Sequence, residues 1–162
     1  MNRDSFINAY DTYADAIFRH CYFRVYDRER AKDIMQETFM KTWEYIASGN
    51  EIENIRAFLY RVANNCIIDN ARKKKERSLD ELQEQGFEPG YDDTKKHQDR
   101  LDAHAALAIV DQLDDKYREA VLLRYLDDLS PKEIASIINE SENVVSVRIH
   151  RGLAQLKKLL KR

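Results

Sequence analysis

Glycine and proline are scarce in this chain, with four and two among 162 residues. Both residues interrupt regular structure or form tight turns, so their scarcity argues against a turn-rich β-sandwich or barrel. Hydrophobic residues make up 43% of the sequence and charged residues 35%, a balance typical of amphipathic helices. The composition therefore predicts an all-α fold.

Cysteine and histidine are also few and are not grouped. Cys21 and Cys66 lie in apolar helical patterns without CxxC spacing, so we expect buried free thiols in a reducing cytoplasm. The sequence has no Gly-rich phosphate loop, nucleophile elbow or HExxH pattern. The histidines are dispersed: His20, His97, His104 and His150. We therefore expect no enzyme, no metal and no cofactor.

Long hydrophobic runs are missing as well. No stretch approaches the roughly 20 apolar residues needed to cross a bilayer. The first 20 residues are charged and aromatic and lack the apolar core of a signal peptide. We expect a cytoplasmic protein without membrane insertion and, beyond Arg162, no appended regulatory domain.

Charge divides the chain into three segments. Residues 1–77 hold 14 Lys/Arg against 12 Asp/Glu, and residues 101–162 hold 10 of each. Residues 78–100 hold 3 against 7 and include two of the four glycines. This composition predicts two small helical domains, 1–77 and 101–162, joined by a flexible acidic linker, 78–100.

Three helices are predicted in the first domain, because apolar residues recur there at three- and four-residue steps. The first stripe comprises Phe6, Tyr10, Tyr13, Ala14, Ile17 and Cys21. The second comprises Ala31, Ile34, Met35, Thr38, Phe39, Thr42, Trp43 and Ile46. We expect this second helix to stop at Ser48-Gly49-Asn50. The third comprises Ile55, Phe58, Leu59, Val62, Ala63 and Cys66, and we expect this helix to end in the basic run 72–75.

The second domain contains the pattern of a helix-turn-helix. Ser130, Pro131 and Glu133 form a capping box with proline at the first helical position, which predicts a helix start. Its expected buried residues are Ile134, Ala135 and Ile138. Asn139 tolerates the left-handed conformation of a turn, and Ser141 can cap a second helix. Helices joined this tightly cross steeply.

The second helix of this pair is basic. Six Lys/Arg and no acid lie between Asn143 and Arg162, which favours attraction to phosphates. The alternative is a solvated helix end, where cations are favoured on structural grounds, and His150 can equally be a plain surface residue. We expect a packing side of Val145, Ile149, Gly152, Leu153, Leu156 and Leu160. The candidate DNA contacts are Ser141, Asn143, Ser146, Val147, Arg148, His150 and Arg151.

Three stretches together resemble the extracytoplasmic-function (ECF, group IV) sigma factors of the sigma-70 family. The run 33–39 with Lys41 and Trp43 is similar to the family's polymerase-binding segment. The run 58–65 with Asp69, Arg72 and Lys73 is similar to the segment that opens and reads the −10 element. Residues 113–160 resemble the −35-reading domain. The resemblance implies a promoter-recognition factor that works with core RNA polymerase and is held inactive by an anti-sigma factor.

The resemblance also implies roles for particular residues. Polymerase binding would fall on Asp33, Gln36, Glu37, Met40, Lys41 and Glu44, although a solvated acidic face is the alternative. The −10 element would be held by Tyr60, Arg61, Asn64, Asn65, Ile68, Arg72 and Lys73. Tyr60 can either stack on a base or belong to the core. The −35 element would be read by the candidate DNA contacts of the second domain.

The sequence departs from the family pattern at three positions of the second domain: Asp114, Asn139 and Ser146 replace a common proline, glycine and basic residue. These departures concern the −35 sequence preference more than the fold. A helix-turn-helix regulator that binds duplex DNA without polymerase would explain 101–162 equally well. It would leave the first 77 residues without a role, since they show no alternating strand and helix pattern.

Overall fold

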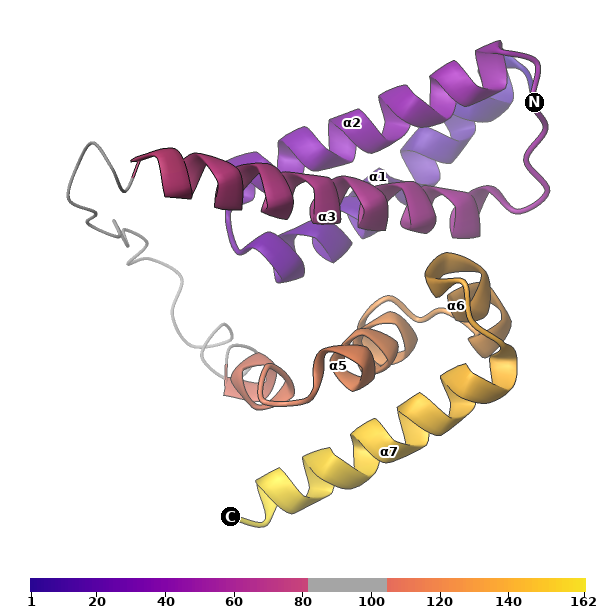
Figure 1. The fold of residues 1–162 in the computed structure, drawn as a ribbon. Coiled ribbons are helices and arrows are strands. Elements are labelled where there is room, and N and C mark those ends of the chain that lie inside the picture. The colour runs from indigo at the N-terminus through magenta and orange to yellow at the C-terminus, as the bar shows by residue number, and fades with distance from the viewer. Residues whose placement is uncertain (82–104) are drawn as a thin grey trace. The chain divides into compact units, whose positions relative to one another are not determined.

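Helices account for all of the regular secondary structure in the two described ranges of the computed structural model, residues 1–81 and 105–162 (Figure 1). The all-α expectation is therefore confirmed. The described helices divide into two compact units, which are taken in turn below. No helix in these ranges is long and apolar enough to cross a membrane.

The N-terminal unit consists of three helices: α1 (Arg3–Val25), α2 (Arg28–Ala47) and α3 (Ile55–Glu81). Side chains cap each start, since the carboxamide of Asn2 accepts from Ser5 N, the carboxylate of Asp27 from Arg30 N and the carboxamide of Asn54 from Ala57 N. The α1–α2 connection turns at Tyr26, which has a φ of 54°. Helix α2 ends at the predicted stop, where Gly49 has a φ of 91°.

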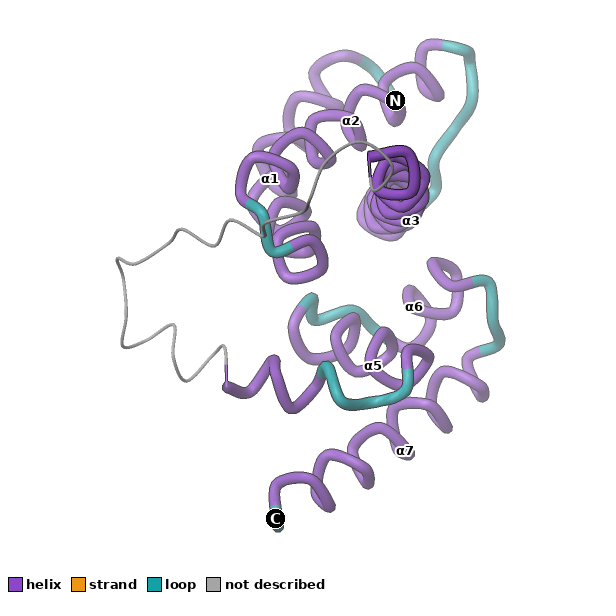
Figure 2. The backbone as a smooth tube through the Cα atoms, turned by 60° about the vertical axis from the view of Figure 1, so that its left-hand side comes forward, coloured by secondary structure: helices purple, strands orange, loops and turns teal. Residues whose placement is uncertain are grey.

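The core of this unit lies where the three apolar stripes meet, because each helix packs on the other two (Figures 1 and 2). Both thiols are fully buried, as the sequence predicts. The Thr38 and Thr42 hydroxyls donate to backbone carbonyls one turn earlier, which satisfies these polar groups inside the core. Other fully buried residues are Ile17, His20, Ala31, Leu59 and Ala63.

Helix α3 does not end in the basic run. It continues through residues 78–81, so the start of the predicted linker is helical. The run Arg72–Lys75 contains no glycine or proline, and lysine and arginine are good helix formers, so nothing in it stops the helix. Residues 82–100 of the predicted linker lie outside the described residues.

The C-terminal unit contains a helical turn at 105–110, α5 (Asp115–Val121), a π-helical turn η1 (Leu122–Leu126), α6 (Pro131–Ile138) and α7 (Glu142–Leu160). Helix α5 packs along α7. The core is apolar, and its most buried members are Leu113, Ala120, Leu123, Leu129, Ile134 and Val145.

Two details of this core differ from the expected packing. Besides Ile134, the buried isoleucine of α6 is Ile137, whereas the expected Ile138 is half-buried. Leu160 is 66% exposed, since it lies in the last turn of α7, beyond the helices that cover the rest of it. The other expected packing residues of α7 are buried or half-buried.

Candidate nucleic-acid interface

The outward face of α2 carries the six residues expected to bind polymerase. Met40 is 57% exposed, and Asp33, Gln36 and Glu44 are exposed around it. Glu37 is half-buried and pairs with the Lys41 ammonium at 3.2 Å. The face therefore offers acidic and amide groups around one flexible apolar side chain.

The Glu37–Lys41 pair lies beside a buried thiol. The hydrogen bond with Glu37 raises the pKa of the Lys41 ammonium above its ordinary value. Burial raises the pKa of the Cys66 thiol, which keeps it protonated and weakly nucleophilic. No group of three potential metal ligands lies together in the described ranges.

A second exposed stripe runs along α3. Arg61, Asn65, Ile68 and Arg72 recur at three- and four-residue steps and are all exposed, with Ile68 at 59%. Asn64 is half-buried on one side of the stripe, and Lys73 is exposed on the other. Six of the seven residues expected at the −10 element thus reach solvent.

Tyr60 is the exception. Its side chain is only 2% exposed, and its ring packs edge-on against His20 with centroids 5.1 Å apart. A base cannot stack on a ring that lies inside the core, so assigning Tyr60 to the −10 element is wrong. Leu59 and Ala63 on the same helix are also fully buried, and the alternative reading of Tyr60 as a core residue is the right one.

An aromatic pair lies at the start of α3. Tyr45 of α2 lies against Phe58 with ring centroids 4.8 Å apart and an interplanar angle of 36°. The Arg61 guanidinium lies 5.4 Å from the Phe58 centroid, and Tyr45 is 39% exposed. The sequence pattern missed Tyr45 because it lies outside both the apolar stripe and the acidic face of its helix. We call Tyr45, Phe58 and Arg61 the aromatic platform.

The helix-turn-helix closes as its sequence predicts. Ser130 N donates to Glu133 Oε2 at 2.9 Å, and Glu133 N donates to Ser130 Oγ at 3.2 Å, which completes the capping box. Asn139 is left-handed with a φ of 56°. The Ser141 hydroxyl accepts from Val144 N at 3.2 Å and caps α7.

The first turns of α7 present the candidate DNA contacts. Asn143, Ser146, Val147, His150 and Arg151 are exposed. Arg148 is different, because its guanidinium donates to Glu140 Oε1 at 3.0 Å and its side chain is 23% exposed. This bond crosses the turn between α6 and α7, so Arg148 also holds the motif together. Ser141 likewise has a structural role, because it caps α7.

Two family models match the chain: Sigma-70 region 2 over residues 9–77 and Sigma-70, region 4 over residues 103–156. The chain is 33% identical over 170 residues to the ECF RNA polymerase sigma factor SigW of Bacillus subtilis (strain 168). That alignment covers 99% of this chain and 91% of SigW. The chain belongs to the ECF sigma factors. As such, it directs RNA polymerase to promoters in transcription initiation, and a polymerase-independent regulator is not favoured.

One further relative and two solved structures are also similar to this sigma factor. It is 32% identical to the ECF RNA polymerase sigma factor SigM of the same organism, over 94% of this chain and 93% of that one. Its fold matches RpoE, solved with the anti-sigma factor NepR from Bartonella quintana, with a TM-score of 0.75, 21% identity and 97% coverage of both chains. It also matches CnrH, solved with the cytosolic domain of CnrY, at 0.74 and 21%, over 99% of this chain and 90% of CnrH.

Proposed function

We propose that three helices of this sigma factor have separate functions. The outward face of α2 binds core polymerase, the α3 stripe with the aromatic platform holds the opened −10 strand, and the start of α7 reads the −35 element. The observation that carries this assignment is the exposure of three separate faces, one on each helix, whose opposite sides form the cores.

The α2 face suits a protein partner better than DNA. Its exposed carboxylates would repel phosphates, whereas they can accept hydrogen bonds from basic groups of a polymerase subunit. Met40 supplies an adaptable apolar contact at the centre, of the kind that often dominates an interface. The nearby Trp43, 38% exposed and 5.0 Å from the Phe6 ring, extends this apolar area.

The α3 stripe suits a single strand. Pulling a base out of the stack costs a few kcal/mol, which stacking and phosphate contacts must offset. The exposed edge of the aromatic platform offers a ring surface and a cation, a combination that binds bases regardless of sequence. Asn65, one turn further along α3 and exposed, can then form hydrogen bonds with base edges.

The start of α7 suits the major groove. The groove admits one helix, and the N-terminal residues of a recognition helix contact base edges. Asn143, Ser146 and Val147 lie there, and Arg151 is one turn further along, where it can reach a phosphate. Because two weak sites joined by a tether act as one stronger site, neither domain alone should select promoters well.

Regulation by an anti-sigma factor fits the same surfaces. RpoE was solved with the anti-sigma factor NepR, and CnrH was solved with the cytosolic domain of CnrY. We propose that a protein of this class masks the DNA-binding faces of α3 and α7 here. The chain would act without catalysis of its own, in the cytoplasm, where polymerase and promoters meet.

Transcription in vitro tests this proposal. The full chain is added to core polymerase and genomic DNA of its host, and RNA 5′ ends are mapped. We expect discrete start sites that share upstream −10 and −35 sequences. A double variant, Met40→Ala with Gln36→Ala, should lose transcripts through weaker core binding, while the matched control Arg19→Gln should not. Random start sites, or equal activity of the double variant, would contradict the assignment.

A further inference from the structure

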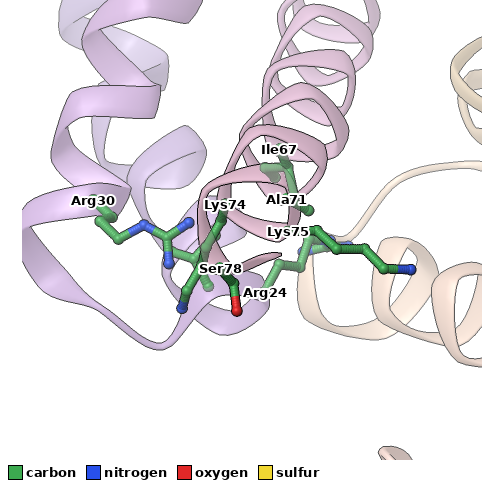
Figure 3. Close-up of a pocket in the computed structure, with 8 residues that line it drawn as sticks. Arg24, Arg30, Ile67, Ala71, Lys74, Lys75 and Ser78 are labelled. Atoms are coloured by element: carbon green, nitrogen blue, oxygen red, sulfur yellow. The ribbon is translucent and has the colours of Figure 1, made fainter. Parts of the chain in front are cut away.

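A basic pocket lies at the end of the N-terminal unit where all three of its helices meet. The pocket is open to solvent and has a volume of about 390 Å³. Arg24 and Val25 come from the end of α1, Arg30 from the first turn of α2, and Ile67, Ala71, Lys74, Lys75 and Ser78 from α3 (Figure 3). None of these residues was expected to bind anything from the sequence.

Charge is the distinctive property of this pocket. Four of its eight lining residues are cations and none is an acid, so the cations repel one another when the pocket holds only water. Three acids lie near these cations along the chain, Asp27, Glu29 and Glu76, and none of them lines the pocket. The Asp27 carboxylate is engaged, since it caps α2 by accepting from Arg30 N at 3.1 Å. Arg24 is held in place by a 2.9 Å hydrogen bond to the His20 carbonyl. The arrangement favours an anion.

The geometry favours phosphate among anions. Guanidinium groups offer planar forks of donors that match phosphate oxygens, and lysines add point charges. Figure 3 shows Arg30, Lys74 and Ser78 close to one another in this view, with Arg24 beside them and Lys75 extending away from them. A tetrahedral anion would meet donors from three helices there, and the Ser78 hydroxyl would add a neutral one.

Lys75 connects this pocket to the α3 stripe. It lies three residues beyond Arg72 and therefore on the same helical face, and it also lines the pocket. Asn65 and Lys75 are ten positions apart, so they are separated by about 15 Å along the helix. At the duplex spacing of about 3.4 Å per nucleotide, that length equals roughly four steps of one DNA strand. A backbone that follows the stripe would pass the pocket's opening.

We propose that this pocket binds a backbone phosphate of promoter DNA, about four nucleotides from the bases held at Asn65. Arg24 and Arg30 would then be DNA-binding residues contributed by helices α1 and α2, outside the recognition helix. This inference rests on the proposed function of the α3 stripe, and it adds a contact that is independent of sequence.

Holoenzyme binding to a labelled promoter fragment, mapped as above and titrated with salt, tests the pocket. Arg30→Gln and Lys74→Gln should each weaken binding by about tenfold. They should also reduce the magnitude of the slope of log binding constant against log salt concentration by about one. The loss should be equal on a fragment with a scrambled −10 element. Arg19→Gln, with the same charge change elsewhere on α1, should have no effect, and Arg30→Lys should retain most of the affinity.

The outcomes separate the pocket from the stripe. If Asn65→Ala loses the −10 preference while both pocket variants bind like Arg19→Gln, the proposed function stands and the pocket inference fails. If the pocket variants alone weaken binding, the pocket stands and the role of Asn65 fails. Binding of pyrophosphate to the free full chain, with DNA affinity unchanged in both pocket variants, would identify a free phosphorylated ligand instead and overturn the inference.

Discussion

Gly152 lies so close to Val121 that a Cβ on the glycine would be 2.6 Å from Val121 Cγ2. The same Cβ would be 3.4 Å from the Tyr117 carbonyl oxygen, which is backbone. Helix α7 can therefore approach α5 this closely only with glycine at that position. The contact fixes the distance between α7, which carries the proposed −35 contacts, and the helix that supports it.

Replacing Gly152 with alanine should destabilise the C-terminal unit by about 1–3 kcal/mol, through overpacking against α5. Hydrogen exchange of peptides from 105–162 measures this unit separately, and peptides from 1–81 serve as the internal control. Combining Gly152→Ala with Val121→Ala should recover part of the loss, because the second change removes the clashing methyl group. If peptides from 105–162 were equally protected from hydrogen exchange in the wild type and in Gly152→Ala, the result would contradict the contact.

Ser141 has a capping role that can be separated from DNA binding. Ser141→Ala should destabilise the C-terminal unit by about 1 kcal/mol, since Val144 N loses its acceptor. Ser141→Asp should keep the cap and stability but weaken DNA binding, because it adds a negative charge near phosphates. A Ser141→Asp variant as unstable as Ser141→Ala would argue against the cap.

The Glu140–Arg148 pair predicts unequal effects for two arginines of α7. Arg151 is exposed, so Arg151→Ala should reduce the salt slope of −35 binding by about one. Arg148→Ala should reduce it less, because Arg148 is already paired with Glu140. Glu140→Gln should strengthen binding by releasing Arg148 toward the phosphates. Footprinting over a salt series measures all three, and an unchanged slope in Arg151→Ala would assign that residue a structural role.

Tyr45 should matter for strand opening and not for duplex binding. Tyr45→Ala should slow formation of permanganate-reactive thymines at the −10 element, since base stacking on an aromatic ring contributes about 1–3 kcal/mol. Tyr45→Phe keeps the ring and should behave as wild type. Tyr60→Phe is the matched control, because Tyr60 is buried. Normal opening in Tyr45→Ala would remove the aromatic platform from the mechanism.

Both thiols should be inert in the native protein. Cys21 and Cys66 are fully buried, and burial raises the pKa of the Cys66 thiol. A chromogenic disulfide reagent at pH 8 should therefore react with neither thiol until denaturant unfolds the N-terminal unit. Rapid reaction of one equivalent without denaturant would indicate that this core opens easily.

Sequence patterns that extend over one or two helical turns predicted much of the fold. The three apolar stripes, the Gly49 stop, the capping box at Ser130 and the left-handed Asn139 each depend on residues within one or two turns, and each is present. The exposed faces of α2, α3 and α7 followed from the same periodicity.

Features that depend on contacts between helices were missed. Tyr60 was misassigned because only the packing of α1 shows that its ring meets His20. The aromatic platform joins Tyr45 and Phe58 from different helices, and the basic pocket joins three helices. The π-helical turn η1, in which Asp127 N donates to the Leu122 carbonyl, was not predicted from the sequence either.

Site-specific photo-crosslinking tests the division of labour most directly. A photoreactive amino acid is placed at Ile68 on α3 or at Ser146 on α7, both exposed, and the holoenzyme is irradiated on a mapped promoter. The account predicts crosslinks from Ile68 to the non-template strand at the −10 element and from Ser146 to the −35 duplex. Crosslinks from Ile68 to the −35 duplex and from Ser146 to the −10 element would contradict it. So would an active complex in which neither residue crosslinks to DNA.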